Sequence, residues 1–394
     1  MEPKFQRLIA RGRYVAIPLV AAAAVAGVTA QTASANAISK KELTSLQSFV
    51  SAAQAAPTWT APGPAVKGSV LKGKTIVTFP ISSEIDACTT QQSDFTAAAT
   101  ALGAKVDALP TGGTGGPPVW NSNLGNAANA KASAVVIFCG ASGAAMSAEL
   151  GTLKSDHIPV VDGNYNQTEG NPGFPFGDLQ GETGVDVYGG VQDDLADALV
   201  NLKGKAAHIL FLDSPSVAQY AGAQDGLKAG IKKWCPKTCT FKEDDVPVQN
   251  WGTDASSVAS DLNANPNINA VIVTFDGMSD DAITQVQAAV SKHPGLKIYA
   301  WGGGSAEEKD VQNNPVFAAD AGPDERWDAY GALDQVIRLV SGKSSVTVQK
   351  EVDPNVFFTK SNVKSFFTPS GGYSDAAFGN GAFIKDFDKL WGVK

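Results

Sequence analysis

The sequence predicts an α/β protein with two doubly wound parallel-sheet lobes. Short and nearly continuous apolar runs alternate with Ala-rich stretches of helical periodicity, which is typical of parallel strands covered by helices on both faces. The alternation occurs twice, because a Gly- and Pro-rich passage at residues 163–184 interrupts it and a second array of the same kind follows. With 394 residues, 43% of them hydrophobic, the chain can bury two cores of ordinary size.

The first array begins at residue 73, after a leader. The leader combines an amphipathic piece at 41–55 with Pro57, Pro62 and Pro64, which predicts an extended segment wrapped on the surface. In the first array, β-branched runs alternate with Ala-rich stretches. The predicted strands are residues 75–79, 105–109, 134–138 and 158–161, and the predicted helices are residues 94–102, 122–132 and 144–154.

The second array repeats this pattern over residues 185–320. Its predicted helices are residues 185–202, 217–234, 255–263, 279–291 and 306–313, and its predicted strands are residues 207–212, 240–242, 270–275, 297–301 and 316–320. A helix at 324–340 and a strand-like segment at 349–359 follow, and they are too few to form a third lobe. A short helix at 383–390 ends the chain.

The predicted division of the chain has five parts. They are a signal peptide at 1–35, the leader at 36–72, an N-terminal lobe at 73–183 with 322–346, a C-terminal lobe at 184–321 with 347–364, and a tail at 365–394 packed on the lobes.

The first 35 residues have the features of an export signal. Arg7, Arg11 and Arg13 precede an apolar stretch at 14–30, and small residues place the cleavage site near Ala35 or Ala37. A membrane-spanning helix is the alternative, although the apolar stretch is at the short limit for one. No cysteine immediately follows the cleavage site, so a lipoprotein is not expected. We expect an exported protein of the periplasm or the exterior of the cell envelope.

The net charge and the cysteine content limit the possible partners and predict disulfides. The net charge of −8 and the absence of a basic stripe argue against a nucleic-acid partner. The close pair Cys235 and Cys239 predicts a disulfide, and Cys88 and Cys139, each after a predicted strand, could form a second. A metal site is the weaker alternative, because the three histidines stand singly.

The motifs predict neither an enzyme nor a cofactor. No serine lies in a nucleophile elbow, and no histidine is near a plausible nucleophile. The glycines at 112–116 lack the Lys-Ser/Thr ending of a phosphate loop and lead into Pro117 and Pro118, which we expect to open no helix. Three glycines at 302–304 indicate a tight turn or a close approach to a ligand.

Polar residues follow many of the predicted strands, at the edge where open parallel sheets bind ligands. Small hydrogen-bonding groups suit a neutral polyhydroxylated ligand, although any one of them could instead cap a helix. Trp301 could also stack on the ring of a ligand, whereas Trp234, Trp251 and Trp391 are interpreted as residues that pack within the protein. The candidate ligand-binding residues are Ser82, Ser83, Glu84, Asp86, Gly140, Asn164, Gln219, Tyr220, Asp276, Gly302, Asp320 and Trp327.

The order of segments over residues 73–363 resembles the type I periplasmic binding proteins of the ribose-binding, sugar-transporter kind. The matching segments include 74–79, 134–138, 158–161, 186–190, 223–226, 270–276, 329–342 and 357–363. The resemblance implies a three-segment hinge near 184–186, 320–323 and 347–351. It also implies that helix 324–340 returns to the first lobe and strand 352–359 to the second.

The chain departs from ribose-type members at three ligand positions. Residues 219–223 contain no arginine, Gly302 replaces an aspartate, and Asn164 with Tyr165 replaces an Asp-Arg pair. These departures disfavour a simple pentose. We therefore expect a monomeric solute-binding protein that captures a small organic ligand, a sugar or sugar-like compound, for a membrane ABC permease. The alternatives are a ligand-sensing module for a membrane receptor and, third, an extracytoplasmic enzyme.

Overall fold

In this computed structural model the described part of the chain is residues 38–393, except 84, 113–115, 141–142, 167–177, 215–216, 218–219, 221, 248–249, 252, 348–349 and 367–375. It falls within one compact unit, Asn36–Lys394. The predicted signal at 1–35, with cleavage near Ala35 or Ala37, therefore lies outside the described residues. Along the described stretch, no helix has the length and apolar character needed to cross a membrane.

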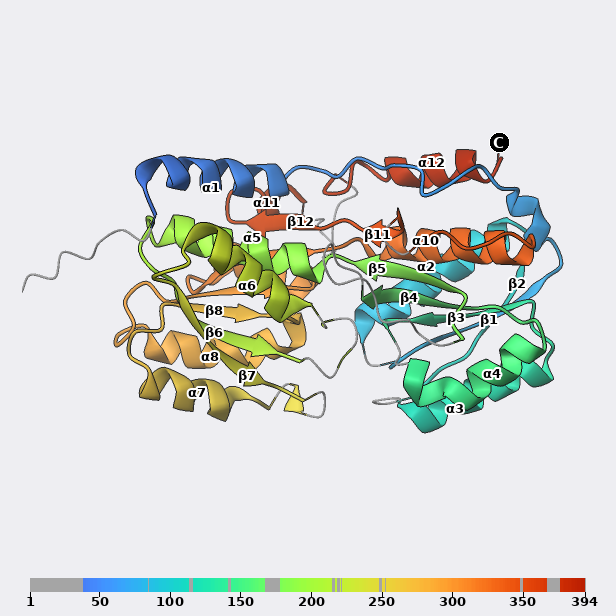
Figure 1. Ribbon diagram of the computed structural model, residues 1–394, viewed down its shortest axis with the longest axis horizontal. Helices are drawn as coiled ribbons and strands as arrows, with labels where there is room; N and C mark the ends of the chain where they lie inside the picture. The colour runs from blue at the N-terminus through green and yellow to red at the C-terminus, as the bar shows by residue number, and fades with distance from the viewer. Residues whose placement is uncertain are drawn as a thin grey trace, which may run out of the picture. The chain divides into compact units, whose positions relative to one another are not determined.

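Two six-stranded sheets organise the molecule, one in each lobe (Figure 1). The first sheet is parallel throughout, in the order β11 (Val352–Asp353), β5 (Gly181–Val185), β4 (Val160–Asn166), β3 (Ala134–Phe138), β1 (Thr75–Pro80) and β2 (Lys105–Ala108). The second has the order β12 (Val356–Thr359), β10 (Phe317–Gly322), β9 (Lys297–Trp301), β8 (Ala270–Val273), β6 (His208–Asp213) and β7 (Thr240–Asp245), with only β12 antiparallel among these strands. The predicted fold class is confirmed.

Helices cover both faces of each sheet, and this explains why the strands are apolar without alternation. On β3, Val136 and Phe138 join one core cluster and Val135 and Ile137 another. The first sheet is flanked by α2 (Asp86–Ala101), α3 (Pro117–Asn129), α4 (Ser147–Ser155) and α10 (Glu325–Val340). The second is flanked by α5 (Val187–Asn201), α6 (Ala223–Trp234), α7 (Ala255–Ala264), α8 (Ser279–Ala289) and α9 (Ser305–Asn313).

Short elements complete the described chain. The helices α1 (Lys40–Ala53) and α12 (Ala382–Leu390) lie near its two ends, and α11 (Val363–Phe366) follows β12. Three 3-10 turns are η1 (Gly68–Leu71), η2 (Gly143–Met146) and η5 (Asp276–Met278). Figure 1 shows α1 beside α5, while α12 lies along the segment that connects α1 to β1.

Three details differ from the sequence-based expectations. Helix α3 begins at Pro117, because proline at the first two positions of a helix needs no N–H partner, so the expectation that Pro117 and Pro118 open no helix was wrong. The single strand expected at 349–359 is two strands, β11 in the first sheet and β12 in the second. The third crossover between sheets therefore lies at Pro354–Asn355 and not at 347–351, because β11 still pairs with β5.

Candidate functional site

The strand orders place a topological switch point in each sheet. In the first sheet the order reverses between β1 and β3, and in the second between β6 and β8. Ligands of open α/β sheets bind at the carboxyl ends of strands at such points. Segments that follow these four strands meet in one cavity of about 40 Å³, lined by Ile81, Ile85, Ala87, Cys88, Cys139, Val217, Tyr220, Trp251, Phe275, Trp301, Gly302, Pro323 and Glu325.

Four aromatic rings from the second lobe form one wall of this cavity. Tyr220 lies 5.9 Å from Trp251, 5.8 Å from Phe275 and 6.1 Å from Trp301 between ring centroids, and Trp251 lies 4.4 Å from Phe275. The indole N–H of Trp251 donates to Ser214 Oγ at 3.2 Å, and that of Trp301 donates to Asn355 Oδ1 at 3.2 Å. Because both indole donors are used within the protein, the two rings are held in fixed orientations.

The opposite wall comes from the first lobe and is apolar. It contains Ile81, Ile85 and the Cys88–Cys139 disulfide. This disulfide joins the start of α2 to the residue after β3, and so ties together the two loops at the switch point of the first sheet. The second predicted disulfide, Cys235–Cys239, closes a short loop after α6. Both predicted pairs are confirmed.

The glycines at 302–304 are required by a close approach of side chains. A Cβ on Gly302 would lie 2.5 Å from Cγ of Asp276, and a Cβ on Gly304 would lie 2.3 Å from Oε2 of Glu307. The Asp276 carboxylate accepts the Gly304 N–H at 2.6 Å, at the start of α9. The glycines therefore accommodate carboxyl groups of the protein itself.

Carboxyl groups gather behind the aromatic wall. Burial raises the pKa of Asp276 well above its ordinary value, and the Glu307 carboxyl adds to the rise. Asp320 is fully buried in β10, and burial together with Asp276 raises its pKa in the same way. Burial also raises the pKa of Glu325, which lines the cavity, to about 8, with Asp324 contributing. With a pKa of about 8, Glu325 is mostly protonated at neutral pH and can donate as well as accept hydrogen bonds. Within the described residues, no group of His, Cys, Asp and Glu side chains could hold a metal ion.

A larger hollow of about 500 Å³ lies at the other edge of the first sheet. Its lining residues include Lys74, Ser133 and Pro159, which precede strands β1, β3 and β4. Lys74, Lys131, Asp156 and His157 are among its lining residues, but the amino ends of parallel strands carry no switch-point crevice. The small cavity between the lobes is therefore the better candidate site.

No family model and no curated protein sequence matches this chain. Solved structures do match. An ABC sugar transporter subunit from Rhodobacter sphaeroides aligns with a TM-score of 0.61 at 19% identity, covering 74% of this chain and 100% of its own. A solute-binding protein from Mycobacterium smegmatis with bound glycerol gives 0.63 at 15% identity, covering 76% and 99%. One from Agrobacterium vitis with bound allitol gives 0.62 at 20% identity, covering 75% and 98%.

The chain has the type I periplasmic binding protein fold. In this fold the described chain passes between the sheets three times: from β5 to α5, from β10 to α10, and from β11 to β12. Each connection is short. The cavity lies beside the second of them, because Pro323 and Glu325 belong to its lining.

The candidate residues from the sequence are found in different places of this fold. Tyr220 and Gly302 line the cavity. Asp276 lies directly behind Gly302, and Asp320 is in the interior of β10. Trp327 is not on the lining, since it stacks on Phe383 of α12 with a centroid distance of 4.6 Å.

The remaining candidates lie in loops of the first lobe or outside the described residues. Ser83 shares a hydrogen bond with the Thr111 hydroxyl at 3.2 Å, Ser82 is buried, and Asp86 is exposed at the start of α2. Gly140 follows the disulfide with a φ of +74°, and Asn164 is described only through its backbone in β4. Glu84 and Gln219 lie outside the described residues.

Sequence reasoning missed the apolar and aromatic character of the lining. Trp251 was interpreted as packing, yet it lines the cavity with Phe275. One signal could have found both: each is an aromatic residue soon after a second-lobe strand, β7 for Trp251 and β8 for Phe275. Trp301, the stacking candidate named from the sequence, also lies on this wall.

Proposed function

We propose that this protein is an exported solute-binding protein, monomeric, that captures a small organic ligand between its lobes and delivers it to a membrane ABC permease. The proposed ligand is a sugar or sugar-like compound. The observation that carries the proposal is the position of the cavity, which lies at the switch points of two sheets and takes its walls from both lobes.

The chemistry of the walls supports a ligand with one apolar face. Tyr220, Trp251 and Phe275 offer ring surfaces, and stacking on such rings contributes about 0.5–1.5 kcal/mol per pair beyond area burial. The Glu325 carboxyl and the Tyr220 hydroxyl are hydrogen-bonding groups on the described lining. A sugar ring has C–H groups on its faces, which can stack on the aromatic rings, and hydroxyls on its rim, which can bond to the polar groups.

The size of the cavity implies that the lobes move. At about 40 Å³ it is far below the ~300–1,000 Å³ that small-molecule sites occupy. A ligand must therefore enter while the lobes are further apart, and their approach then buries it. Similar solved structures hold glycerol, allitol and D-allose, and these bound molecules support this ligand class.

The test is a thermal-shift screen of the purified protein with glycerol, allitol, D-allose, glucose and galactose, followed by calorimetric titration of the best compound. Ligand that binds only the folded state raises the melting temperature. Trp251→Ala should weaken binding about two- to twelvefold, the equivalent of ~0.5–1.5 kcal/mol. Trp234→Ala is the matched control, because Trp234 lies on α6, packs against Phe49 and does not line the cavity.

Three outcomes would contradict the proposal in different ways. If no sugar or polyol shifts the melting temperature but an aromatic acid does, the ligand class is wrong and the capture site stands. If Trp251→Ala and Trp234→Ala weaken binding equally, the site is elsewhere. If cells that lack the protein take up the best compound at the normal rate, delivery to a permease is wrong.

A further inference from the structure

The segment at residues 38–71, here called the strap, is attached to both lobes. Its first attachment is to the second lobe through α1, whose Leu46 and Val50 are buried in the same cluster as Leu195 and Leu199 of α5. Helix α1 is fixed at its start by a capping box, in which Ser39 and Glu42 bind each other's backbone N–H groups.

Further contacts hold α1 in place on the second lobe. Phe49 meets the edge of Trp234 at 5.2 Å between centroids, and Lys233 Nζ lies 5.1 Å from the Phe49 ring centre. Just after the helix, the Gln54 amide donates to Thr359 Oγ1 of β12 at 3.0 Å. The strap is therefore bound to the second lobe as far as residue 54.

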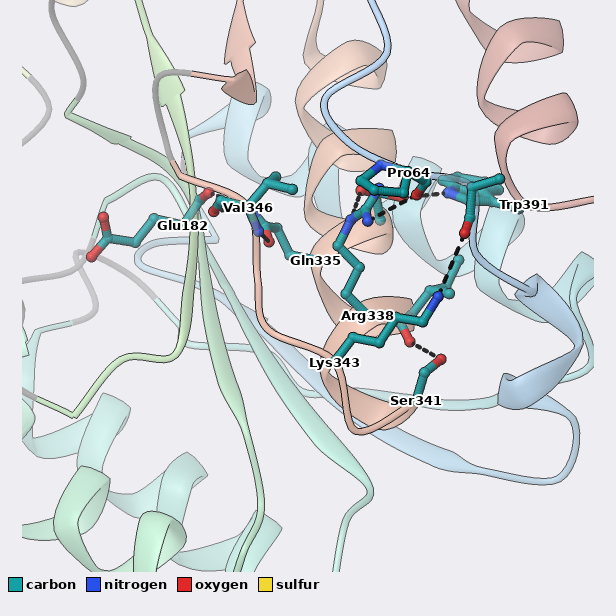
Figure 2. Close-up of polar contacts among 11 residues, drawn as sticks. Pro64, Glu182, Gln335, Arg338, Ser341, Lys343, Val346 and Trp391 are labelled. Carbon is teal, nitrogen blue, oxygen red and sulfur yellow. Dashed lines mark hydrogen bonds and ion pairs between the residues drawn. The ribbon is translucent and has the colours of Figure 1, made fainter.

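The second attachment of the strap is to the first lobe. Arg338 Nη1 of α10 donates to the Pro64 carbonyl at 3.0 Å (Figure 2). The Val66 and Gly68 N–H groups donate to the carbonyls of Leu390 and Trp391 at 3.0 and 2.9 Å. A Cβ on Gly63 would lie 2.8 Å from Cγ1 of Val346, so the strap meets this lobe in close contact.

The C-terminal helix α12 holds this end of the strap against α10. Trp391 Nε1 donates to Asp334 Oδ1 at 2.8 Å, and Arg338 Nε donates to Asp334 Oδ2 at 2.5 Å. Asp334 is fully buried and Arg338 is 3% exposed. Trp59 of the strap also meets Phe387 of α12, with 5.3 Å between ring centroids. The attachment thus combines a buried ion pair on the first lobe with aromatic contacts to α12.

Between the two attachments the strap crosses beside the third connection of the lobes. Residues Thr58–Pro62 share one hollow with Val352 of β11 and with Pro354 of the β11–β12 connection. Pro57 and Pro62 bracket this stretch, and each proline restricts its own backbone φ. The strap is therefore a short crossing with both ends fixed.

We propose that the strap is a fourth connection between the lobes, which restrains how far they rotate apart. Short connections allow domain rotation because a few residues absorb the change of backbone angle. A segment of limited length that is fixed at both ends adds a limit that those connections do not set, and so it reduces the population of widely open conformations. This inference concerns the motion of the lobes alone and does not depend on the ligand or the permease.

The experiment measures the distance between the lobes without ligand. Spin labels are attached at Ser122 on α3 and Ser256 on α7, both exposed, in protein whose native disulfides stay oxidised. The variant carries an insertion of about 12 Gly and Ser residues between Ala55 and Ala56, which adds a flexible coil of roughly 20 Å. The matched control has the same insertion before Gly295, in the exposed turn that precedes β9.

The strap variant should give a broader distance distribution, shifted to longer distances, and the control should match the parent protein. An unchanged distribution in a strap variant of parental melting temperature would overturn the proposal. If the insertion prevents folding, a protease site at 55–56 allows the strap to be cut in the folded protein. The cut protein should broaden in the same way, and an unchanged distribution after complete cutting would likewise overturn it.

Discussion

Replacing Arg338 with methionine should destabilise the protein strongly, because it leaves a buried carboxylate without its cation. Asp334 and Arg338 are one turn apart on α10, with Nε and Oδ2 at 2.5 Å, and neither side chain is more than 3% exposed. Loss of one partner of a buried pair costs about 3–5 kcal/mol. Loss of the bond to the Pro64 carbonyl adds about 1 kcal/mol.

A double-mutant cycle shows whether the cost comes from the unpaired charge. Asp334→Leu alone should also cost several kcal/mol, because it leaves the guanidinium buried. The double variant Asp334→Leu/Arg338→Met loses the hydrogen bonds to Trp391 and Pro64, but it should still cost much less than the sum, since it leaves no buried charge unpaired. The assay is urea unfolding at equilibrium, followed by far-UV circular dichroism.

The matched control is a salt bridge on the surface. Lys154 and Asp178 are paired with side chains 60% and 33% exposed, so Lys154→Met should cost no more than about 1 kcal/mol. The reasoning is refuted if Arg338→Met costs as little as Lys154→Met. It is also refuted if the costs of the two single substitutions simply add in the double variant.

Three further predictions concern pH, disulfides and the glycine turn. Burial raises the pKa of Asp213 to about 7, so the folded state binds this proton more tightly than the unfolded state. The stability that the protonated Asp213 carboxyl contributes is fully present below pH ~4 and is lost as pH rises to 7. The melting temperature should therefore fall between pH 5 and 8, and a rise over this range would contradict the prediction. Replacing the Cys88–Cys139 pair by serines should cost about 4 kcal/mol and the Cys235–Cys239 pair about 2, because the sequence separations are 51 and 4; equal losses in urea unfolding would refute the argument. Gly302→Ala should destabilise the protein by at least ~1 kcal/mol, because its φ of +155° is strained for a residue with a side chain and its Cβ would overlap the Asp276 carboxyl; partial restoration by Asp276→Ala would support the overlap as one cause, and no restoration would argue against it.

The main elements of the fold could be predicted from the sequence because the strands are buried on both faces. A strand such as β3 is apolar at every position, and this pattern is typical of a parallel sheet covered by helices on both faces. Strand β5 could not be predicted in this way. Its residues, Gly-Glu-Thr-Gly-Val, have no strand pattern, and the packing around Gly181 is tight, since a Cβ there would lie 3.2 Å from Val161 and 3.3 Å from Gln335.

The candidate site was less predictable than the fold. The strand ends that meet at the cavity follow from topology, and Tyr220 and Gly302 were found by that rule. The apolar lining could not be predicted in this way, because polar side chains at strand ends can point into the protein and form hydrogen bonds with its own backbone. Asp276 does so, since its carboxylate accepts the Gly304 N–H at the start of α9. Which side chains of a loop face a cavity depends on such contacts across the chain.

A crystal structure of the protein with the best compound from the thermal-shift screen would locate the ligand directly. We expect one molecule per chain between the lobes, stacked on the wall formed by Trp251, Phe275 and Trp301, in a cavity much larger than the present ~40 Å³. Glu325 or Tyr220 should lie within hydrogen-bond distance of a ligand hydroxyl. Ligand bound outside the two lobes, or bound between them without contact to these rings, would contradict it.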